Sequence, residues 1–423
     1  MKNRLPATAL AAALLAFPAA SMATNGYFSH GYGIKSKGMG GVGIALPQDT
    51  LAAASNPAGM VEVGSRLDVG VDWFHPTRGS EIRGNAYPDA NYDGNDKQDF
   101  FIPEFGYNKM LDERTSLGIT AYGNGGMNSD YKVNSFERFG ATGSSGVNLE
   151  QLFIAPTLAY KLTPSHSVGV SLNFAYQRFS AKGLGPFAMS GPGQASASPG
   201  NVTNNGTDSA TGWGVRIGWL GQLTPDLAVG ATYQSKTSMT KLDKYQGLFA
   251  EQGGMDIPEN YGVGVAFKAT PQLTVAADVV RINYSSIKSI GSGIANMTVL
   301  GNPLGAANGP GFGWTDMTVV KLGASYQFNA NLTLRAGYNH GKQPIPSSET
   351  FLNILAPGVV EDHVTFGATW ALDKQSEVSL SYLHAFKNTV SGSATAIPAS
   401  FGGGTANLYM SQDALGIAYG RKM

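Results

Sequence analysis

A glycine-rich run at residues 38–43 is the first stretch that could carry chemistry. Its letters, GMGGVG, match the G-x-G-x-x-G spacing that lets a backbone approach a pyrophosphate. That use requires a strand before the run and a helix after it, and the sequence predicts neither. The glycines are therefore interpreted as points where a confined segment can bend.

The six histidines are the next candidates, as metal ligands or general bases. They show no metal-ligand spacing, and the chain has no cysteine, so neither a metal site nor a cofactor is predicted. His384 shares strand parity with Leu380 and Tyr382, where a Ser–His pair would suit a lipid-facing hydrolase. No matched serine is evident, so the protein is not expected to be an enzyme.

Charged residues within alternating segments form the third group. Their parity turns them away from their apolar neighbours, so they are expected to face a lumen as ion pairs or as a solvated wall. Arg178 shares parity with the apolar face, but it lies at the end of its segment, where the alternation breaks. Whether its side chain points inward or outward therefore stays open. The inward-facing set is Asp68, Asp72, Arg216, Asp278, Lys321 and Arg335.

The N-terminus indicates export. Lys2 and Arg4 precede the apolar run ALAAALLAFPAA, and small residues follow at 21–23, as in a secretory signal peptide spanning residues 1–23. Twenty-nine basic residues balance 29 acidic ones, so no nucleic-acid partner is indicated.

Fourteen segments after residue 65 alternate with period two. In HSVGVSLNFAYQRF, for example, Val170, Leu172 and Phe174 share one face, and Ser171 and Asn173 share the other. The expected strands are 66–74, 99–109, 115–123, 149–162, 166–179, 211–223, 226–235, 259–270, 272–284, 316–329, 331–341, 361–372, 376–387 and 410–420.

The connections between these segments alternate between short turns and long polar loops. An even number of strands of about ten residues, with turns at one end and loops at the other, is typical of an outer-membrane barrel. We therefore predict an all-β protein: a 14-stranded antiparallel transmembrane β-barrel over residues 66–423. A soluble β-sandwich or an extracellular adhesin is the alternative.

The size of this barrel raises a problem, because fourteen strands enclose a wide lumen. Residues 24–65 are the one strandless segment long enough to fill it. We therefore predict that they form an N-terminal hatch inside the barrel. The outer loops carry apolar residues that a simple ion pore would not need, and these suggest a landing site for a hydrophobic ligand: Leu184, Phe187, Met189, Leu248, Phe249 and Met255.

Several stretches together resemble the FadL family of outer-membrane transporters for long-chain fatty acids and related hydrophobic compounds. They are the N-terminus through Asn56-Pro57-Ala58, LGITAYGNGGMNSDY, YQRFSAKGL, GFGWTDMTVVKLGASYQF, RAGYNHGKQPIP and SYLHAF. The resemblance covers essentially the whole mature chain. It implies passive transport: a ligand is captured in a lumen pocket, the N-terminus shifts, and the ligand leaves sideways where the third strand is kinked.

The resemblance also implies site residues. An arginine and a lysine of the family's pocket meet the substrate carboxylate; Arg178 matches the arginine, with Phe179 beside it, whereas Thr315 stands near the position of the lysine. Tyr27 and Phe28 are expected near the pocket, as the displaceable end of the hatch.

The turn at Asn56, Pro57 and Ala58 is predicted to take part in gating. Proline fixes φ and restrains the preceding residue, so the asparagine amide is held in a defined place. Gly123 and Gly125 weaken the third strand and permit a bulge or kink there. We expect Asn56 to hydrogen-bond this kinked strand. The alternative is a plain turn into the first strand.

The sequence thus favours a passive importer in the outer membrane of a Gram-negative cell. An aromatic-hydrocarbon importer of the same fold and a structural or adhesive surface barrel are the alternatives. The expected partners are a long-chain fatty acid or another hydrophobic small molecule, outer-membrane lipid and lipopolysaccharide, and the barrel assembly machinery. The mature protein is expected to be a monomer.

Overall fold

The computed structural model describes residues 25–191 and 194–423. The predicted signal peptide, residues 1–23, lies outside the described residues. Within the described ranges, none of the helices is long and apolar enough to cross a membrane.

Fourteen antiparallel strands form one closed wall, because the last strand pairs with the first along its whole length. The predicted 14-stranded barrel is confirmed. Two further strands, β2 (Ala90–Asp93) and β9 (Ser238–Met239), pair with β1 and β7 at the loop end and lie outside this count. The wall strands are β1 Arg66–Arg83, β3 Phe100–Met110, β4 Thr115–Tyr131, β5 Ser145–Thr163, β6 His166–Lys182, β7 Asp208–Thr224, β8 Leu227–Gln234, β10 Asn260–Lys268, β11 Leu273–Ile282, β12 Met317–Asn329, β13 Leu332–Gly341, β14 Asp362–Ala371, β15 Ser376–Val390 and β16 Thr405–Lys422.

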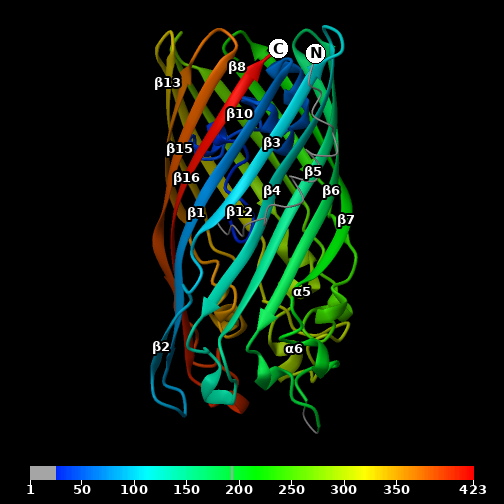
Figure 1. Ribbon diagram of the computed structural model, residues 1–423, viewed down its shortest axis with the longest axis vertical. Helices are drawn as coiled ribbons and strands as arrows, with labels where there is room; N and C mark the ends of the chain where they lie inside the picture. Colours follow the sequence, from blue (N-terminus) through cyan, green and yellow to red (C-terminus); the bar gives the residue numbers. More distant parts are fainter. Residues whose placement is uncertain (1–24, 192–193) are drawn as a thin grey trace, which may run out of the picture.

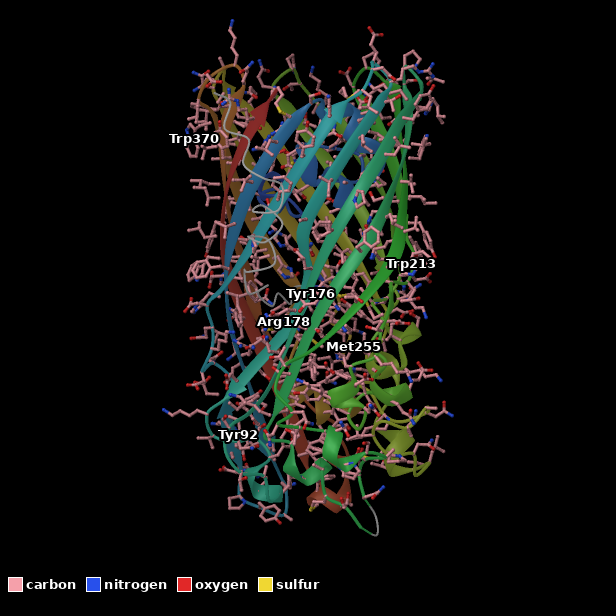
Figure 2. The ribbon with its side chains drawn as sticks, turned by 45° about the vertical axis from the view of Figure 1, so that its right-hand side comes forward. Tyr92, Tyr176, Arg178, Trp213, Met255 and Trp370 are labelled. Atoms are coloured by element: carbon pink, nitrogen blue, oxygen red, sulfur yellow. The ribbon has the colours of Figure 1, made fainter. Side chains whose placement is uncertain are left out.

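The alternation of apolar and polar residues along each strand separates the outside of the wall from the lumen. On β6, Phe174 is 49% exposed on the outer face, whereas Asn173 and Gln177 are fully buried inside. Trp213 and Trp370 likewise project outward from the wall (Figure 2). The wall therefore presents a hydrophobic face to lipid and polar side chains to its contents.

The two ends of the barrel differ. Short turns join the strands at the end drawn uppermost in Figure 1, and long loops with short helices fill the opposite end. The loop helices are η3 Glu137–Phe139, η4 Gly185–Phe187, η5 Pro199–Asn201, η6 Asp243–Tyr245, α4 Ala250–Gly253, η7 Tyr284–Ser286, α5 Lys288–Gly291, α6 Ala295–Thr298, η8 Ser347–Glu349, η9 Leu352–Ile354 and η10 Ala399–Phe401.

Several strands extend beyond their predicted ends toward the loops. The third wall strand, β4, was expected over 115–123 but continues to Tyr131. From Ala121 onward nearly every residue of β4 is buried or partly buried on both faces. The period-two pattern fades there, because neither face meets lipid or open water.

Residues 25–65 lie inside the barrel, in the half that carries the short turns (Figure 1, dark blue). We call this segment the hatch. It consists of turns and short helices and is almost entirely buried. Its helices are α2 Ile34–Lys37, η1 Thr50–Ala54, η2 Pro57–Gly59 and α3 Met60–Val63.

Candidate functional site

The inward-facing charges predicted from parity all contact the hatch, so they are anchors and not a solvated wall. Asp278 accepts hydrogen bonds from the backbone N–H groups of Gly43 (2.8 Å) and Ile44 (3.1 Å). Lys321 donates to the carbonyl of His30 at 2.8 Å. The remaining four pair with hatch residues as follows: Asp68 with Thr50, Asp72 with Lys37, Arg216 with Ser55, and Arg335 with Gln48.

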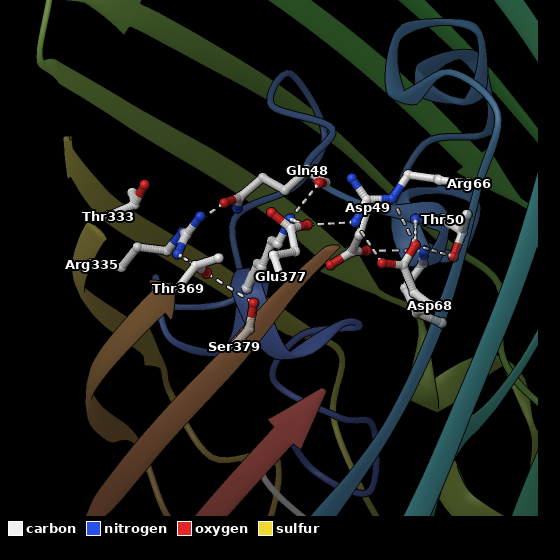
Figure 3. Close-up of polar contacts among 12 residues, drawn as sticks. Gln48, Asp49, Thr50, Arg66, Asp68, Thr333, Arg335, Thr369, Glu377 and Ser379 are labelled. Atoms are coloured by element: carbon white, nitrogen blue, oxygen red, sulfur yellow. Dashed lines mark hydrogen bonds and ion pairs between the residues drawn. The ribbon is translucent and has the colours of Figure 1, made fainter. Parts of the chain in front are cut away.

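One network ties the hatch to the start of the wall (Figure 3). Arg66 bonds Asp68 and Glu377, each at 2.6 Å, and Glu377 also pairs with Lys35 of α2. Asp68 in turn receives the N–H of Thr50 at 3.0 Å. Buried charges are tolerated when they are paired in this way.

A second ion cluster holds α2 against β1 and β3. Lys37 is buried between Asp72 (3.0 Å) and Glu104 (3.6 Å). Burial favours the neutral amine, but the attraction of the two carboxylates outweighs it and raises the pKa of Lys37 above its ordinary value. Lys37 is therefore a fixed positive charge, and α2 is a firmly held part of the hatch.

The bends of the hatch follow from its glycines. Gly40 and Gly41 adopt φ values of 71° and 79°, in the left-handed region that side-chain-bearing residues avoid. The N–H of Gly40 donates to Thr365 of β14 at 2.7 Å. The G-x-G-x-x-G run is thus a bend that packs against the wall.

The prediction that Asn56 hydrogen-bonds the third strand is wrong. Its amide donates to the carbonyls of Ile44 (2.7 Å) and of Trp219 on β7 (2.9 Å), and its oxygen caps η2 by accepting from Ala58. Pro57 occupies the first position of that helix, where its missing N–H is not needed. The turn fastens the hatch to the wall on the side of β6 and β7; its role in gating stays a prediction.

Pairing between β3 and β4 stops halfway along these strands. Phe105–Met110 pair with Ser116–Ala121, but toward the loops the only wall strand that β3 pairs with is β1, and the only wall strand that β4 pairs with is β5. The register of β4 shifts between Gly123 and Gly125, so the expected bulge is present. Residues 100–104 of β3 and 122–126 of β4 lie opposite each other but are not paired. We call this stretch the seam.

The N-terminal turn of the hatch, residues 25–29, occupies the inner side of this seam. Phe28 forms a β-bridge with Gly125, the N–H of Gly126 donates to Tyr27 at 2.9 Å, and the N–H of Ser29 donates to Asn124 at 3.1 Å. A Cβ on Gly125 would lie 1.9 Å from the carbonyl oxygen of Tyr27. Glycine is therefore required at 125 for the hatch turn to dock.

A single tyrosine of the long loop after β11 holds the same turn from the other side. The hydroxyl of Tyr284 accepts from the N–H groups of Tyr27 (3.2 Å) and Phe28 (3.3 Å) and donates to the carbonyl of Asn25. Tyr284 also packs edge-on against Trp314, at 5.2 Å between ring centroids. The end of the hatch is thus connected directly to the outer loops.

Two cavities lie among those loops. The outer one has a volume of about 1160 Å³ and a mixed lining, with apolar and aromatic side chains such as Phe139, Met189 and Phe401 beside polar ones such as Arg138 and Gln194. The inner one, of about 30 Å³, is lined by Phe187, Phe312 and other apolar residues, with one serine. One continuous cluster of buried side chains connects the inner cavity with the hatch turn.

The predicted landing residues separate into two groups. Met189 is 61% exposed at the outer cavity. Leu184, Phe187, Leu248 and Phe249 instead line the inner cavity, and Met255 is buried. The loops fold into the barrel mouth, so most of their apolar side chains face one another and not the solvent.

Arg178 and Phe179 point in opposite directions. Arg178 shares the outward-facing row of β6 with Phe174 and Tyr176 (Figure 2) and pairs with Glu150 at 3.3 Å. Phe179 is buried inside and packs against Phe249 of the inner cavity, at 4.7 Å between ring centroids. The geometry therefore favours Phe179 as a pocket residue but turns Arg178 away from both cavities.

His384 lies on the outer face, as its parity predicts. Its Nδ1 is 2.9 Å from Asp413, which also accepts a hydrogen bond from Tyr382. His340 pairs with Asp362 in the same way at 2.8 Å. Across the two described ranges, no three potential metal ligands gather in one place.

Sequence reasoning missed Tyr284, Trp314 and the anchoring role of the wall charges. Tyr284 was expected at the end of a strand over 272–284, but β11 ends at Ile282 and Tyr284 begins the loop helix η7. Trp314 lies in a long loop without periodicity, where no pattern distinguishes a buried ring from an exposed one. The anchors were identified as inward-facing, and the signal for their role was available: charges at lumen positions require partners, and the hatch was the expected content of the lumen.

Comparison with known proteins agrees with this architecture. Residues 12–420 match the family described as "Outer membrane protein transport protein (OMPP1/FadL/TodX)". The long-chain fatty acid transport protein of Escherichia coli K12 is 22% identical over 434 residues, which cover 89% of this chain and 91% of that protein.

Solved structures show the same fold. The toluene transporter TodX of Pseudomonas putida superimposes with a TM-score of 0.70 at 20% identity, covering 93% of this chain and 99% of TodX. A FadL homologue of Pseudomonas aeruginosa gives a TM-score of 0.69 at 15% identity, covering 94% and 99% of the two chains. With a family match over nearly its whole length, the chain belongs to the OMPP1/FadL/TodX family of outer-membrane transport proteins.

Proposed function

We propose that the protein is a passive importer of long-chain fatty acids or related hydrophobic compounds, with lateral release at the seam. One observation carries the proposal: buried apolar side chains form a continuous cluster from the inner cavity to a hatch turn that is paired with the kinked edge of β4. A hydrophobic ligand can follow such a route without crossing a polar channel.

The energetics of the hatch turn support this route. Among the described residues, two backbone hydrogen bonds join the turn to β4 and three more join it to the hydroxyl of Tyr284, each worth about 1 kcal/mol. A ligand that buries ten methylenes gains about 8 kcal/mol. Binding of a long acyl chain can therefore offset the release of the turn and the movement of the aromatic rings packed on it, which is consistent with transport without an energy source.

Lateral release suits a ligand of this kind. The seam lies in the wall of the barrel, so a ligand released there would enter the hydrocarbon of the membrane, which is the environment an acyl chain prefers. In the direction of the short turns, the ligand would instead have to pass the ion clusters around Lys37 and Arg66. The charged half of the hatch thus favours a sideways exit.

An aromatic-hydrocarbon importer is the second candidate. It is favoured by the inner cavity, which is small and contains no charged side chain. The name of TodX, a toluene transporter, fits this candidate, as the name of the E. coli relative fits the first.

Uptake of radiolabelled oleate and toluene by cells that lack their own transporters, with and without this protein in the outer membrane, tests the proposal. We expect oleate uptake to rise at least tenfold over the empty-vector control. An increase in toluene uptake without an increase in oleate uptake would favour the second candidate. A folded barrel that increases the uptake of neither compound would indicate a structural or adhesive surface protein.

A further inference from the structure

The seam is closed at its loop-side end as well as at its turn-side end. Toward the turns it ends at Phe105, where the pairing of β3 with β4 begins. Toward the loops, residues 94–96, which precede β3, lie against β4. The N–H of Asp130 donates to the carbonyl of Gly94 at 3.1 Å, and the N–H of Asp96 donates to the carbonyl of Asp130 at 3.0 Å. The seam is therefore a gap that is bounded at both ends.

Arg78 of β1 fastens the loop-side end. Its side chain is fully buried, and its Nε donates to the carbonyl of Asn128 on β4 at 2.7 Å. One terminal nitrogen donates to the side-chain oxygen of Asn128 and, at 2.8 Å, to the carbonyl of Lys97. The other donates to the carbonyl of Pro76 at 3.1 Å and to the side-chain oxygen of Asn95 at 3.5 Å. The guanidinium thus joins β4 to the segment before β3. We call Arg78 with these acceptors the clamp.

The clamp uses every donor that an arginine has. The guanidinium carries five N–H groups, each of them has an acceptor, and all the acceptors are uncharged oxygens. No donor is left for a ligand, so the side chain can only hold protein segments together. A lysine has three donors around one nitrogen and could not reproduce this planar fork.

The clamp also fixes both edges of the seam. Phe100, the first seam residue of β3, lies with its ring centroid 5.9 Å from the guanidinium of Arg78 and 5.2 Å from the ammonium of Lys97, within reach of cation–π attraction. On the other edge, the side-chain amide of Asn128 donates to Asn148 of β5 at 2.9 Å. The edges of β3 and β4 are thus held where they approach the loops.

We propose that Arg78 is a positioning residue that sets the size of the molecules released at the seam. The proposal rests on the proposed lateral release and adds a determinant of ligand size to it. Two strand edges that are joined at both ends of a gap can bow apart only slightly. If the loop-side end is freed, the edges can diverge from Phe105 onward, and a broader molecule can pass between them.

Uptake of two fatty acids that differ in width tests this role. One is palmitate, and the other is a fatty acid of similar length with a pyrene ring at its tail. We expect Arg78→Met to raise the uptake of the pyrene compound relative to palmitate at least fivefold. Binding of either compound to the purified protein should change less than twofold, since the clamp lines neither loop cavity. Arg78→Lys should give an intermediate ratio.

A disulfide in place of the clamp provides a test within one folded protein. The chain has no cysteine, and Asn95 and Asp130 form a β-bridge. Asn95→Cys and Asp130→Cys are therefore introduced together into the Arg78→Met variant, or into Arg78→Lys if the methionine variant does not fold. The oxidised form should regain the wild-type preference for palmitate, and a reductant should abolish it. Because both forms are the same chain, a folding defect cannot cause the difference.

Arg83→Met is the matched control. Arg83 lies on the same strand and holds the same connection through Ala90 (3.0 Å) and Asn91, but the bonds of its side chain stay on β1 and that connection. Its uptake ratio should equal that of the wild type. An uptake ratio that is the same in the wild type, in Arg78→Met and in both redox forms would overturn the role of the clamp.

Two further outcomes would concern the proposed function and not the clamp. Palmitate uptake that persists in Gly123→Phe, whose added side chain enters the seam, would refute release at the seam itself. If the wild type takes up neither fatty acid, the proposed import of long-chain acids fails.

Discussion

Replacing Gly123 with phenylalanine is expected to reduce uptake of a hydrophobic ligand at least tenfold while leaving its binding to the purified protein unchanged within twofold. A Cβ at this position lies 2.8 Å from the Cγ2 methyl of Ile102 on β3, so an added side chain enters the seam. If release is lateral, as proposed, a phenyl ring there would fill the space through which the ligand leaves. The proposal places capture among the loops, so binding should be unaffected.

Ile119→Phe is the matched control for this variant. Ile119 lies on the same strand but is exposed on the outer face, where added bulk meets only lipid. Gly123→Ala should give an intermediate loss of uptake, and heat-modifiable electrophoretic mobility verifies that each barrel is folded. Normal uptake in a folded Gly123→Phe variant would rule out release at the seam.

Deletion of residues 25–59 is expected to raise ion conductance at least tenfold in planar bilayers and to leave the barrel folded. The deletion removes three of the four hatch helices, α2, η1 and η2, and exposes the wall charges to water, which can solvate them. It also removes the ring contacts of Tyr27 with Tyr284 and Trp314, at 5.2 and 6.0 Å between centroids. The loops that fill the other half of the barrel lose this support.

The intact chain, recorded under the same conditions, is the reference and should conduct few ions. Far-UV circular dichroism and resistance to unfolding in detergent establish that the shortened barrel keeps its strands. A folded deletion variant whose ion conductance stays as low as that of the intact chain would show that the inward-folded loops close the lumen by themselves. The hatch would then not be the plug.

The barrel could be predicted from the sequence because its strands separate two different environments. Along β6, lipid outside and polar contents inside impose a strict alternation from Val170 to Gln177. The prediction of strand ends was poorer where that contrast disappears. The end of β4 lies where both faces are covered. The first half of β16, from Thr405, has only half-buried positions on its outer row, so the contrast between its faces is weaker there than in its second half.

The candidate site was predictable only in part, for the same physical reason. Gly125 could be identified because a glycine in a strand marks a bulge or a close backbone approach. The partner of Asn56 could not, because several strands surround the hatch and a turn motif does not specify which of them it meets. The direction of Arg178 depended on whether β6 keeps its alternation beyond the expected end at residue 179; the strand continues to Lys182, so Arg178 stays on the outward row.

The most direct test of the account follows the ligand itself. A long-chain fatty acid with a diazirine at its tail is irradiated in intact outer membranes that contain the protein, and the labelled residues are identified by mass spectrometry. Lateral release predicts adducts at Phe312 beside the inner cavity, at Phe28 in the hatch turn, and at Phe101 on the outer face of β3 beside the seam. Adducts at Leu46 and Gln48 in the charged half of the hatch, with none at the seam, would contradict it and indicate passage straight through the barrel.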